Sequence, residues 1–364
     1  MPGADPSNPN RAGHGADVAI IGDGVIGLST ALELARRGAT CCLIGAQHDG
    51  AASSAAAGLL APAVGHLPPA ARPMFVASLE QYPEFLESLR EFDASLSMLE
   101  GLIEIFHESP THSADASSHA LSTADVKRLE PSLSAPFGGV LHPRDGAIDN
   151  VRLVRAMRAA VTSHPNVPFI ADNPAVAVAA NDQSVAVDLR DGSRVDARHI
   201  VVAAGAWSSF LRGLPRQLPV SPLKGQMLAV EATGLHHPVM GADVYLVPRE
   251  REIVVGATSE HAGFDTTTTA DAINGLRAAA ERLYPGLSSA KVVRAWAGIR
   301  PATPDMLPII GNDPKAPRIL YACGHSKNGI LLAPATAKSI AALVQGAAPE
   351  WDLSAFAVSR FATA

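Results

Sequence analysis

Two glycine-bearing segments near opposite ends of the chain constrain its fold more than any other feature. The apolar run 16–21 leads into Gly22-Asp23-Gly24-Val25-Ile26-Gly27, and the run 319–323 leads into Gly324-His325-Ser326-Lys327-Asn328-Gly329-Ile330. Each predicts a buried strand, a tight turn and a helix that begins near the glycines. Two helix N-termini directed at one elongated ligand suit a dinucleotide, with its pyrophosphate at one and its redox ring at the other. The pair therefore indicates a flavin.

The first segment follows the G-x-G-x-x-G pattern of dinucleotide-binding folds. Gly22 permits the turn, Gly24 lets the backbone approach the pyrophosphate, and Gly27 lets the helix pack closely on the strand. The helix predicted to follow spans 25–37 and ends before Gly38. A glycine-rich turn that binds no ligand is the alternative interpretation.

The second strand, predicted over 40–44, should end in an acid that binds the adenosine ribose hydroxyls. Gly45 occupies that position, and along the chain the next acid is Asp49. No arginine follows the strand, so the departure does not favour NADP. The sequence leaves open how the ribose is held.

Composition excludes several classes of protein. The net charge of −6 and a pI near 6.1 argue against a nucleic-acid partner. Three cysteines provide no disulfide framework and suggest a reducing compartment. No apolar run approaches the ~18 residues needed to cross a bilayer. Residues 1–15 have no apolar h-region and are expected to form a disordered lead, so we expect a cytoplasmic location.

The region after the first glycine turn is dominated by small residues. Residues 51–60 read Ala-Ala-Ser-Ser-Ala-Ala-Ala-Gly-Leu-Leu, which describes either a linker or a loop lying flat along a pyrophosphate and a flavin edge. A helical stretch is predicted over 72–92. A helix capped by Asp149-Asn150 follows further on, and the buried-strand pattern returns at 199–207.

Between residues 219 and 299 the pattern changes to short strands separated by turns. Strands are predicted at 226–230, 244–247, 253–257 and 292–297, with one helix at 270–283. We expect a mixed fold, α/β plus antiparallel β, in which a substrate domain is inserted into a Rossmann-like dinucleotide-binding domain. The expected dinucleotide-binding segments are 16–85, 149–218 and 299–364, and the expected substrate-domain segments are 86–148 and 219–298.

An ordered set of segments resembles the FAD-dependent amino-acid oxidases of the D-amino-acid-oxidase superfamily, and among them the glycine oxidases of bacterial thiamine biosynthesis most. The matching segments are Gly22 to Gly27, Ser54-Ala55-Ala56-Ala57-Gly58, Pro222-Leu223-Lys224-Gly225-Gln226, Tyr245-Leu246-Val247-Pro248-Arg249, Val254-Val255-Gly256-Ala257-Thr258, Trp296-Ala297-Gly298-Ile299-Arg300-Pro301, and Gly324 to Ala335.

The resemblance implies a non-covalent FAD, a small amino acid or amine as substrate, and oxygen reduced to hydrogen peroxide. Hydride would leave Cα for flavin N5, forming an imine and then an oxo acid. Arg300 would pair with the substrate carboxylate, and Tyr245 and Ser259 would face the substrate. The implied cofactor residues are Gly22, Gly24, Val25, Ile26, Gly27, Ser53, Ser54, Ala57, Gly58, Leu59, Val176, Ala204, Gly205, Trp207, Arg300, His325, Asn328, Gly329 and Ile330.

Physical chemistry supports parts of this assignment. The planar fork of Arg300 gives two parallel hydrogen bonds to a carboxylate, although a structural ion pair is the alternative. Tyr245 could equally be a core residue. The N-terminus of the helix at 328–330 could stabilise negative charge on the flavin N1–C2=O edge. Cys323, ending a buried strand, is expected to be inert, and the histidines show no metal-site spacing.

Four alternatives remain open from sequence. The electron acceptor could be other than oxygen, which would make the protein a dehydrogenase. Gly324-His325-Ser326-Lys327-Asn328 nearly matches a hydrolase nucleophile elbow, but no histidine follows Ser326. A NAD-dependent dehydrogenase would leave the Arg300 segment without a role, and a flavin fold without catalysis is the fourth. The substrate and the oligomeric state, a homo-oligomer included, are not determined by sequence.

Overall fold

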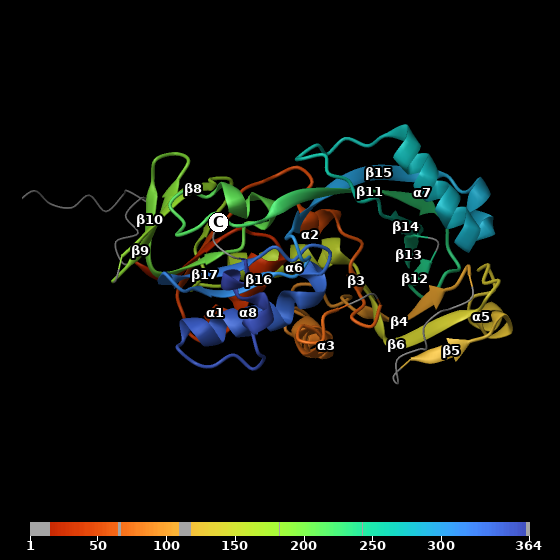
Figure 1. Cartoon of the computed structure of the whole chain (residues 1–364), viewed down its shortest axis with the longest axis horizontal. Helices are drawn as coiled ribbons and strands as arrows, with labels where there is room; N and C mark the ends of the chain where they lie inside the picture. Colours follow the sequence, from red (N-terminus) through yellow and green to blue (C-terminus); the bar gives the residue numbers. More distant parts are fainter. Residues whose placement is uncertain (1–14, 65–66, 109–117, 182, 242, 362–364) are drawn as a thin grey trace, which may run out of the picture.

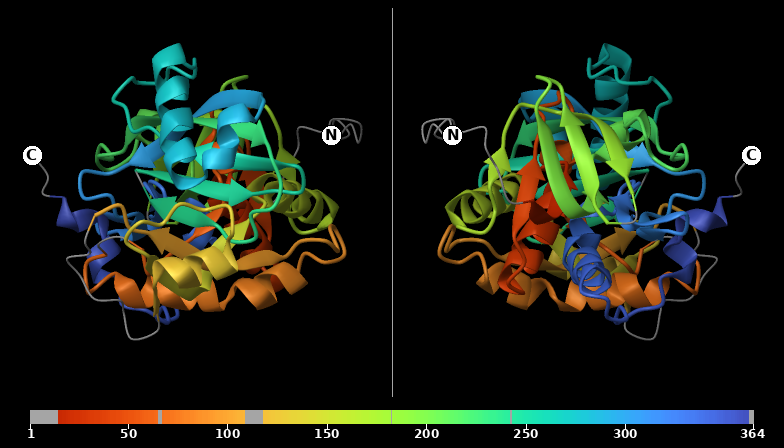
Figure 2. Two further views of the ribbon diagram at one scale, coloured as in Figure 1. Left: turned by 90° about the vertical axis from the view of Figure 1, so that its right-hand side faces the viewer. Right: turned by 90° about the vertical axis from the view of Figure 1, so that its left-hand side faces the viewer.

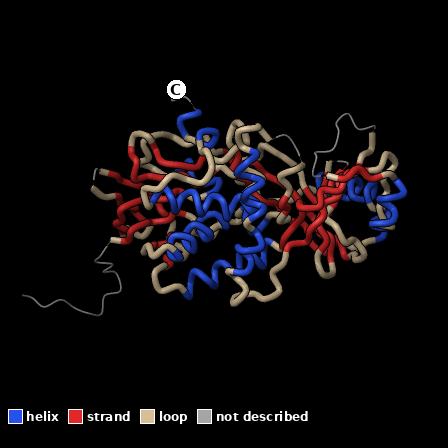
Figure 3. Tube along the Cα trace, turned by 90° about the horizontal axis from the view of Figure 1, so that it is seen from below, coloured by secondary structure: helices blue, strands red, loops and turns tan. Residues whose placement is uncertain are grey.

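The computed structural model describes residues 15–64, 67–108, 118–181, 183–241 and 243–361. The predicted disordered lead, 1–15, lies almost entirely outside these residues. The described strands form two sheets, which lie toward opposite ends of the long axis with most helices between them (Figure 1, Figure 3).

The first sheet has a parallel centre in the order β17-β10-β1-β2-β7. β16 adds to one edge antiparallel to β17, and β8 and β9 extend from β10 as antiparallel strands (Figure 2, right). The strands are β1 (Ala16–Ile21), β2 (Cys41–Ile44), β7 (Phe169–Ile170), β8 (Ala175–Ala180), β9 (Val185–Leu189), β10 (Arg194–Val202), β16 (Ile309–Asp313) and β17 (Ala316–Cys323). The central strands are buried because helices and the β8–β9 extension cover both faces.

Among the helices of this part, α1 contacts α6 and α8, α3 packs on α8, and α2 packs on α6. They are α1 (Val25–Arg36), α2 (Ala52–Ala55), α3 (Arg72–Glu80), α4 (Tyr82–Glu87), α6 (Asn150–Ser163) and α8 (Gly329–Val344). Short 3-10 turns lie at η1 (Gly205–Phe210), η3 (Ser354–Phe356) and η4 (Val358–Arg360). Asp149 caps α6 as expected, accepting a hydrogen bond from the Arg152 backbone N–H at 3.0 Å.

The second sheet runs in the order β15-β11-β14-β13-β12-β4-β6-β3, and β5 pairs with β6. Its strands are β3 (Leu59–Leu60), β4 (Met98–Ile105), β5 (His119–Leu121), β6 (Gly139–Ile148), β11 (Ser221–Glu231), β12 (Val239–Gly241), β13 (Val244–Pro248), β14 (Glu252–Gly256) and β15 (Val292–Ala302). Helix α7 (Ala270–Leu283) packs on β11, β13 and β14 (Figure 2, left), followed by η2 (Pro285–Ser289), and α5 (Thr123–Leu129) precedes β6.

Several local expectations are corrected. The helix expected over 72–92 divides into α3 and α4, because Pro83 has no N–H to continue the first helix. Part of the small-residue run forms α2 and β3 rather than a flat loop. The strand expected to 207 ends at Val202. The second sheet is antiparallel except where β12 pairs parallel with β4.

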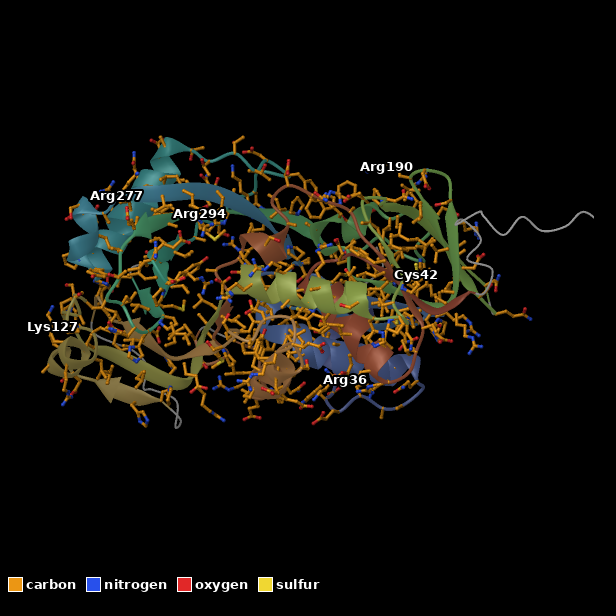
Figure 4. The ribbon with its side chains drawn as sticks, turned by 180° about the vertical axis from the view of Figure 1, so that it is seen from behind. Arg36, Cys42, Lys127, Arg190, Arg277 and Arg294 are labelled. Atoms are coloured by element: carbon orange, nitrogen blue, oxygen red, sulfur yellow. The ribbon has the colours of Figure 1, made fainter. Side chains whose placement is uncertain are left out.

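The strands of the first sheet all fall within the segments predicted for the dinucleotide-binding domain. Among the strands of the second sheet, β3 falls in the same predicted segments and β15 crosses the predicted boundary at 298/299. The division into two domains is retained as a proposal with these two exceptions. Cys42 lies in the part built on the first sheet, and Arg277 and Arg294 lie at the other end (Figure 4).

Candidate active site

A cavity of about 970 Å³ extends from the carboxyl ends of β1, β10 and β17 to the inner strands of the second sheet. This position, beyond the carboxyl ends of parallel strands, is where α/β folds bind dinucleotides. The residues of the predicted site that line the cavity are Gly22, Gly24, Val25, Ile26, Ser53, Ala57, Gly58, Leu59, Ala204, Gly205, Trp207, Tyr245, Ser259, Arg300, His325, Asn328, Gly329 and Ile330.

Three predicted cofactor residues do not line this cavity: Gly27, Ser54 and Val176. Gly27 is required by packing, since a Cβ there would lie 1.7 Å from the carbonyl oxygen of Gly22. The short helix α2 turns Ser54 toward another surface, where its carbonyl accepts a hydrogen bond from Asn150. Val176 lies in β8, and its neighbour Ala175 lines the cavity in its place.

The first glycine turn leaves no room for a side chain at its first position. Gly22 has φ +113°, and a Cβ there would lie 2.3 Å from the carbonyl oxygen of Ala203. The Ser53 hydroxyl accepts a hydrogen bond from the backbone N–H of Val25, the first residue of α1, at 3.0 Å. Helix α1 has no acidic residue in its first turn. Its N-terminus is therefore suited to an anionic ligand.

The second glycine turn presents another helix N-terminus to the same cavity. Helix α8 begins after Asn328, without a side-chain cap and without an acid in its first turn. Gly324, at φ +72°, leads into the turn. His325 is buried, its Nε2 lies 3.1 Å from the Thr336 hydroxyl, and burial lowers its pKa to about 3. The imidazole is therefore neutral near pH 7.

A serine hydrolase would need a base beside the Ser326 hydroxyl in this turn. Ser326 has φ +51°, and its hydroxyl contacts Met306 Sδ at 3.6 Å. The adjacent His325 is directed to Thr336 instead. Among the described residues, no histidine is hydrogen-bonded to the Ser326 hydroxyl, so the proton transfer that activates a serine nucleophile has no acceptor there.

Cys323 also lines the cavity. The residue is 1% exposed, and burial raises its pKa to about 12. The thiol is therefore protonated near neutral pH, which disfavours nucleophilic attack on a cofactor. Non-covalent binding remains a prediction.

Near β2, the acid that lines the cavity comes from the first glycine turn. Asp49 is exposed and does not line the cavity. Asp23, from the first glycine turn, does line it, and a Cβ on Gly45 would lie 2.7 Å from Asp23 Cγ. A larger residue at position 45 would collide with Asp23.

The opposite end of the cavity is built from side chains on the second sheet. Arg300, on β15, is half-buried, and its NH1 group donates a hydrogen bond to the Thr258 carbonyl at 3.0 Å. Among the described residues Arg300 has no salt bridge, in contrast to Arg294 on the same strand, which pairs with Glu252. A Cβ on Gly225 would lie 2.4 Å from Arg300 NH2, so the guanidinium packs directly on this glycine.

Tyr245, on β13, lies beside Arg300 of β15. Its hydroxyl donates to Met227 Sδ at 3.4 Å. Burial raises the pKa of the Tyr245 phenol, and the nearby charge of Arg300 partly opposes that rise. Ser259 lies beyond the end of β14 and is exposed at the cavity edge. Asp23 and Met227 also line the cavity, although neither was expected there, because only three-dimensional contacts place their side chains at the site.

Other kinds of site find less support in the structure. In the part of the chain that the structure describes, no group of three or more His, Cys, Asp or Glu side chains could hold a metal ion. Over the same residues, no helix combines the length and apolarity that crossing a membrane requires.

Comparisons with known proteins agree with this geometry. The family described as FAD dependent oxidoreductase matches residues 17–343. Glycine oxidase of Pseudomonas putida is 33% identical over 363 residues, which cover 93% of this chain and 97% of the relative. The crystal structure of glycine oxidase from Geobacillus kaustophilus has a TM-score of 0.86 at 28% identity, and the alignment covers 96% of this chain and 99% of that one.

The chain belongs to the FAD-dependent oxidoreductase family. The resemblance drawn from the sequence is thereby confirmed, and FAD is the cofactor of this family. A bifunctional ThiO/ThiG protein of Synechocystis sp. is 35% identical over 364 residues, covering 96% of this chain but 54% of the relative. The chain spans about half the length of such bifunctional relatives.

The residues present fit FAD. Gly24 has no side chain between the backbone and the cavity, which permits close approach of a pyrophosphate, and two helix N-termini without first-turn acids border the same cavity. The first turn and Ser53 would hold the pyrophosphate, and the start of α8 would lie against the flavin.

Proposed function

We propose that this protein oxidises a small amino acid or amine, of the glycine, sarcosine or D-amino-acid type, and passes the electrons to oxygen to form hydrogen peroxide. The observation that carries the proposal is Arg300, a half-buried guanidinium that lines the cavity and has no carboxylate partner among the described residues. A substrate carboxylate would give this half-buried cation an opposite charge and hydrogen-bond acceptors.

The surroundings of Arg300 support a fixed orientation for that carboxylate. One guanidinium nitrogen is held by the Thr258 carbonyl, and the group lies against Gly225. A planar fork held in one place binds a carboxylate in one place, so the substrate's Cα is positioned rather than merely attracted. Tyr245 and Met227 form apolar and weakly polar walls beside it.

FAD, when bound, supplies the two-electron oxidation that no amino-acid side chain performs. The residues of this chain bind and orient the substrate and limit the space around it. Among the described residues, Glu104 on β4 and Asp243 in the β12–β13 turn also line the cavity. We assign neither of them the role of a catalytic base, and we propose that the amine reacts in its neutral form.

Relatives support this assignment at the level of class. The glycine oxidases of Pseudomonas putida and Geobacillus kaustophilus cover nearly the whole chain. Iminodiacetate oxidase of Chelativorans sp. has a TM-score of 0.83 at 27% identity. The names of these relatives share an amine that bears a carboxylate. A role in thiamine biosynthesis is part of the proposal and rests on the resemblance.

The test is to reduce the enzyme with candidate substrates. The purified FAD-loaded protein is mixed without oxygen with glycine, sarcosine, D-alanine, iminodiacetate or benzylamine, and flavin absorbance near 450 nm is followed. We expect bleaching by carboxylate-bearing amines and not by benzylamine. Admitting oxygen should restore the colour with one hydrogen peroxide per substrate. Slow reoxidation by oxygen but fast reoxidation by a quinone would contradict the oxidase and indicate a dehydrogenase.

A further inference from the structure

The space beside the end of β2 is occupied by the side chain of Asp23, which comes from the first glycine turn. Dinucleotide-binding folds place an acid just after the second strand to bind the ribose hydroxyls. Here that position is Gly45, and a Cβ built on it would lie 2.7 Å from Cγ and 2.8 Å from Oδ2 of Asp23. The carboxylate of Asp23 therefore fills the volume that a side chain at position 45 would enter.

We propose that Asp23 replaces the missing acid, and that its carboxylate binds the ribose hydroxyls in the AMP half of FAD. Asp23 and Gly45 both line the cavity, and the Asp23 side chain is 13% exposed. In this chain the acid is in the first glycine turn instead of at the end of β2, and its side chain occupies the space that the glycine at position 45 leaves open. The strand end offers no substitute of its own, because the Gly45 N–H already donates to the Ile170 carbonyl at 2.8 Å.

A second residue positions this carboxylate. Arg158, from α6, donates a hydrogen bond from NH2 to Asp23 Oδ2 at 2.7 Å. The guanidinium itself lies over the ring of Phe169, 5.4 Å from the ring centroid. Among the described residues, no hydrogen bond reaches the other oxygen, Oδ1 of Asp23. One carboxylate oxygen is thus anchored, and the other can accept from a sugar hydroxyl.

The ion pair between Arg158 and Asp23 also reduces the repulsion between the Asp23 carboxylate and a bound pyrophosphate. A lone carboxylate in the first glycine turn would repel the pyrophosphate that the turn binds. Arg158 supplies the compensating charge directly at Asp23, with the Arg158 side chain 43% exposed on the outer side. A hydroxyl that donates to a carboxylate forms a charge-assisted hydrogen bond, which corresponds to about a ten- to hundredfold gain in affinity.

The test measures binding and needs no turnover. Apoprotein is titrated with FAD and with FAD analogues whose adenosine lacks the 2′- or the 3′-hydroxyl, and Kd is obtained from the flavin fluorescence change. We expect the unmodified protein to bind FAD at least about tenfold more tightly than one of the analogues. In Asp23→Ala this preference should fall below about threefold, while Asp49→Ala should retain it.

A purely structural role for Asp23 gives a different result. Loss of the Arg158 pair alone would lower the melting temperature of the apoprotein and weaken FAD and its analogues by the same factor. An unchanged preference in Asp23→Ala, or no preference in the unmodified protein, would overturn the proposal. Asp23→Asn keeps the shape and an acceptor for Arg158, so it provides the same measurement if the alanine variant does not fold. Failure here leaves the amine-oxidase proposal intact, because flavin bleaching by substrates tests that separately.

Discussion

Near β1, Gly22 at the cavity and Gly27 inside α1 leave no room for a Cβ, and this end of the site depends on the path of the backbone. At the end near β15, the site is shaped by Arg300, Tyr245 and Met227, whose side chains reach inward from three antiparallel strands. The end near β1 therefore requires positions without a side chain, whereas the end near β15 requires particular side chains. The two ends should respond oppositely to mutation: the first to the addition of a methyl group, the second to the removal of a side chain.

The largest effect is expected from adding a methyl group at Gly22. In Gly22→Ala, the new Cβ would lie 2.3 Å from the Ala203 carbonyl oxygen, at a φ of +113° that alanine adopts unfavourably. Strain and overpacking together should destabilise the apoprotein by about 3 kcal/mol or more and prevent FAD binding. Urea unfolding and FAD titration measure the two effects.

Gly38→Ala is the matched control. Gly38 also has a positive φ, +85°, but a Cβ there would have no atom within 4 Å. This variant should lose only about 1 kcal/mol from backbone strain and should bind FAD normally. Equal behaviour of the two variants would show that strain rather than space governs the first turn.

Removing the guanidinium at Arg300 should have the next largest effect. Arg300→Ala should retain FAD while kcat/KM for carboxylate-bearing amines falls by at least about 30-fold, or about 2 kcal/mol, since the substrate carboxylate loses its partner. Arg300→Lys should recover part of that loss, because an ammonium group cannot reproduce the planar fork. Steady-state kinetics with glycine and with an amine lacking a carboxylate provide the measurement.

The control for Arg300 lies on the same strand. Arg294 stacks on Trp296 and pairs with Glu252, and it does not line the cavity. Arg294→Ala should leave kcat/KM unchanged. If activity toward glycine survives Arg300→Ala, the substrate is held elsewhere and the amino-acid assignment fails, although the FAD site stands.

The same contrast explains what could be predicted from the sequence. The glycine turns, their strands and their helices were predictable because each unit is encoded in one continuous segment, 16–36 and 316–344. The inserted second sheet was predictable as a change of pattern from buried runs to short alternating strands.

Contacts between distant residues were not predictable. The collision of a Gly45 side chain with Asp23 depends on how β2 lies beside the first turn, and the packing of Arg300 on Gly225 depends on the register of β11 and β15. Neither pair has a local signature. The short pairing of β3 with β6 across the predicted domain boundary was missed for the same reason.

A buried histidine tests whether the second glycine turn also depends on a side chain. His325 accepts a proton near pH 6.5 when unfolded but only near pH 3 when folded, because burial disfavours the charged ring. Its lowered pKa therefore contributes stability above pH 6.5 that is lost as the pH falls. Between pH 7 and pH 5 this loss should amount to about 2 kcal/mol.

The comparison uses His325→Gln, which cannot take up a proton in this range. Urea unfolding of the apoprotein at pH 7, 6 and 5 should show a smaller loss of stability in this variant than in the unmodified protein. His119→Gln, at an exposed position on β5, should follow the unmodified protein. Parallel pH profiles for all three would mean that His325 titrates normally and that the turn opens readily to water.

The smallest expected effect comes from Gly225, a position at the substrate end where a side chain would collide with Arg300. In Gly225→Ala the new Cβ would lie 2.4–2.6 Å from the Arg300 guanidinium, so Arg300 must move by a few tenths of an ångström or more. We expect kcat/KM for carboxylate-bearing amines to fall about tenfold, with FAD affinity unchanged, because the fork no longer positions Cα. Gly275→Ala on α7, where a Cβ would have no atom within 4 Å, should have no effect on kinetics.

If Gly225→Ala keeps full activity, the Arg300 guanidinium can bind the substrate carboxylate from more than one position. The substrate end would then tolerate displacement that the dinucleotide end does not, because a long side chain can readjust its torsions whereas a backbone turn cannot.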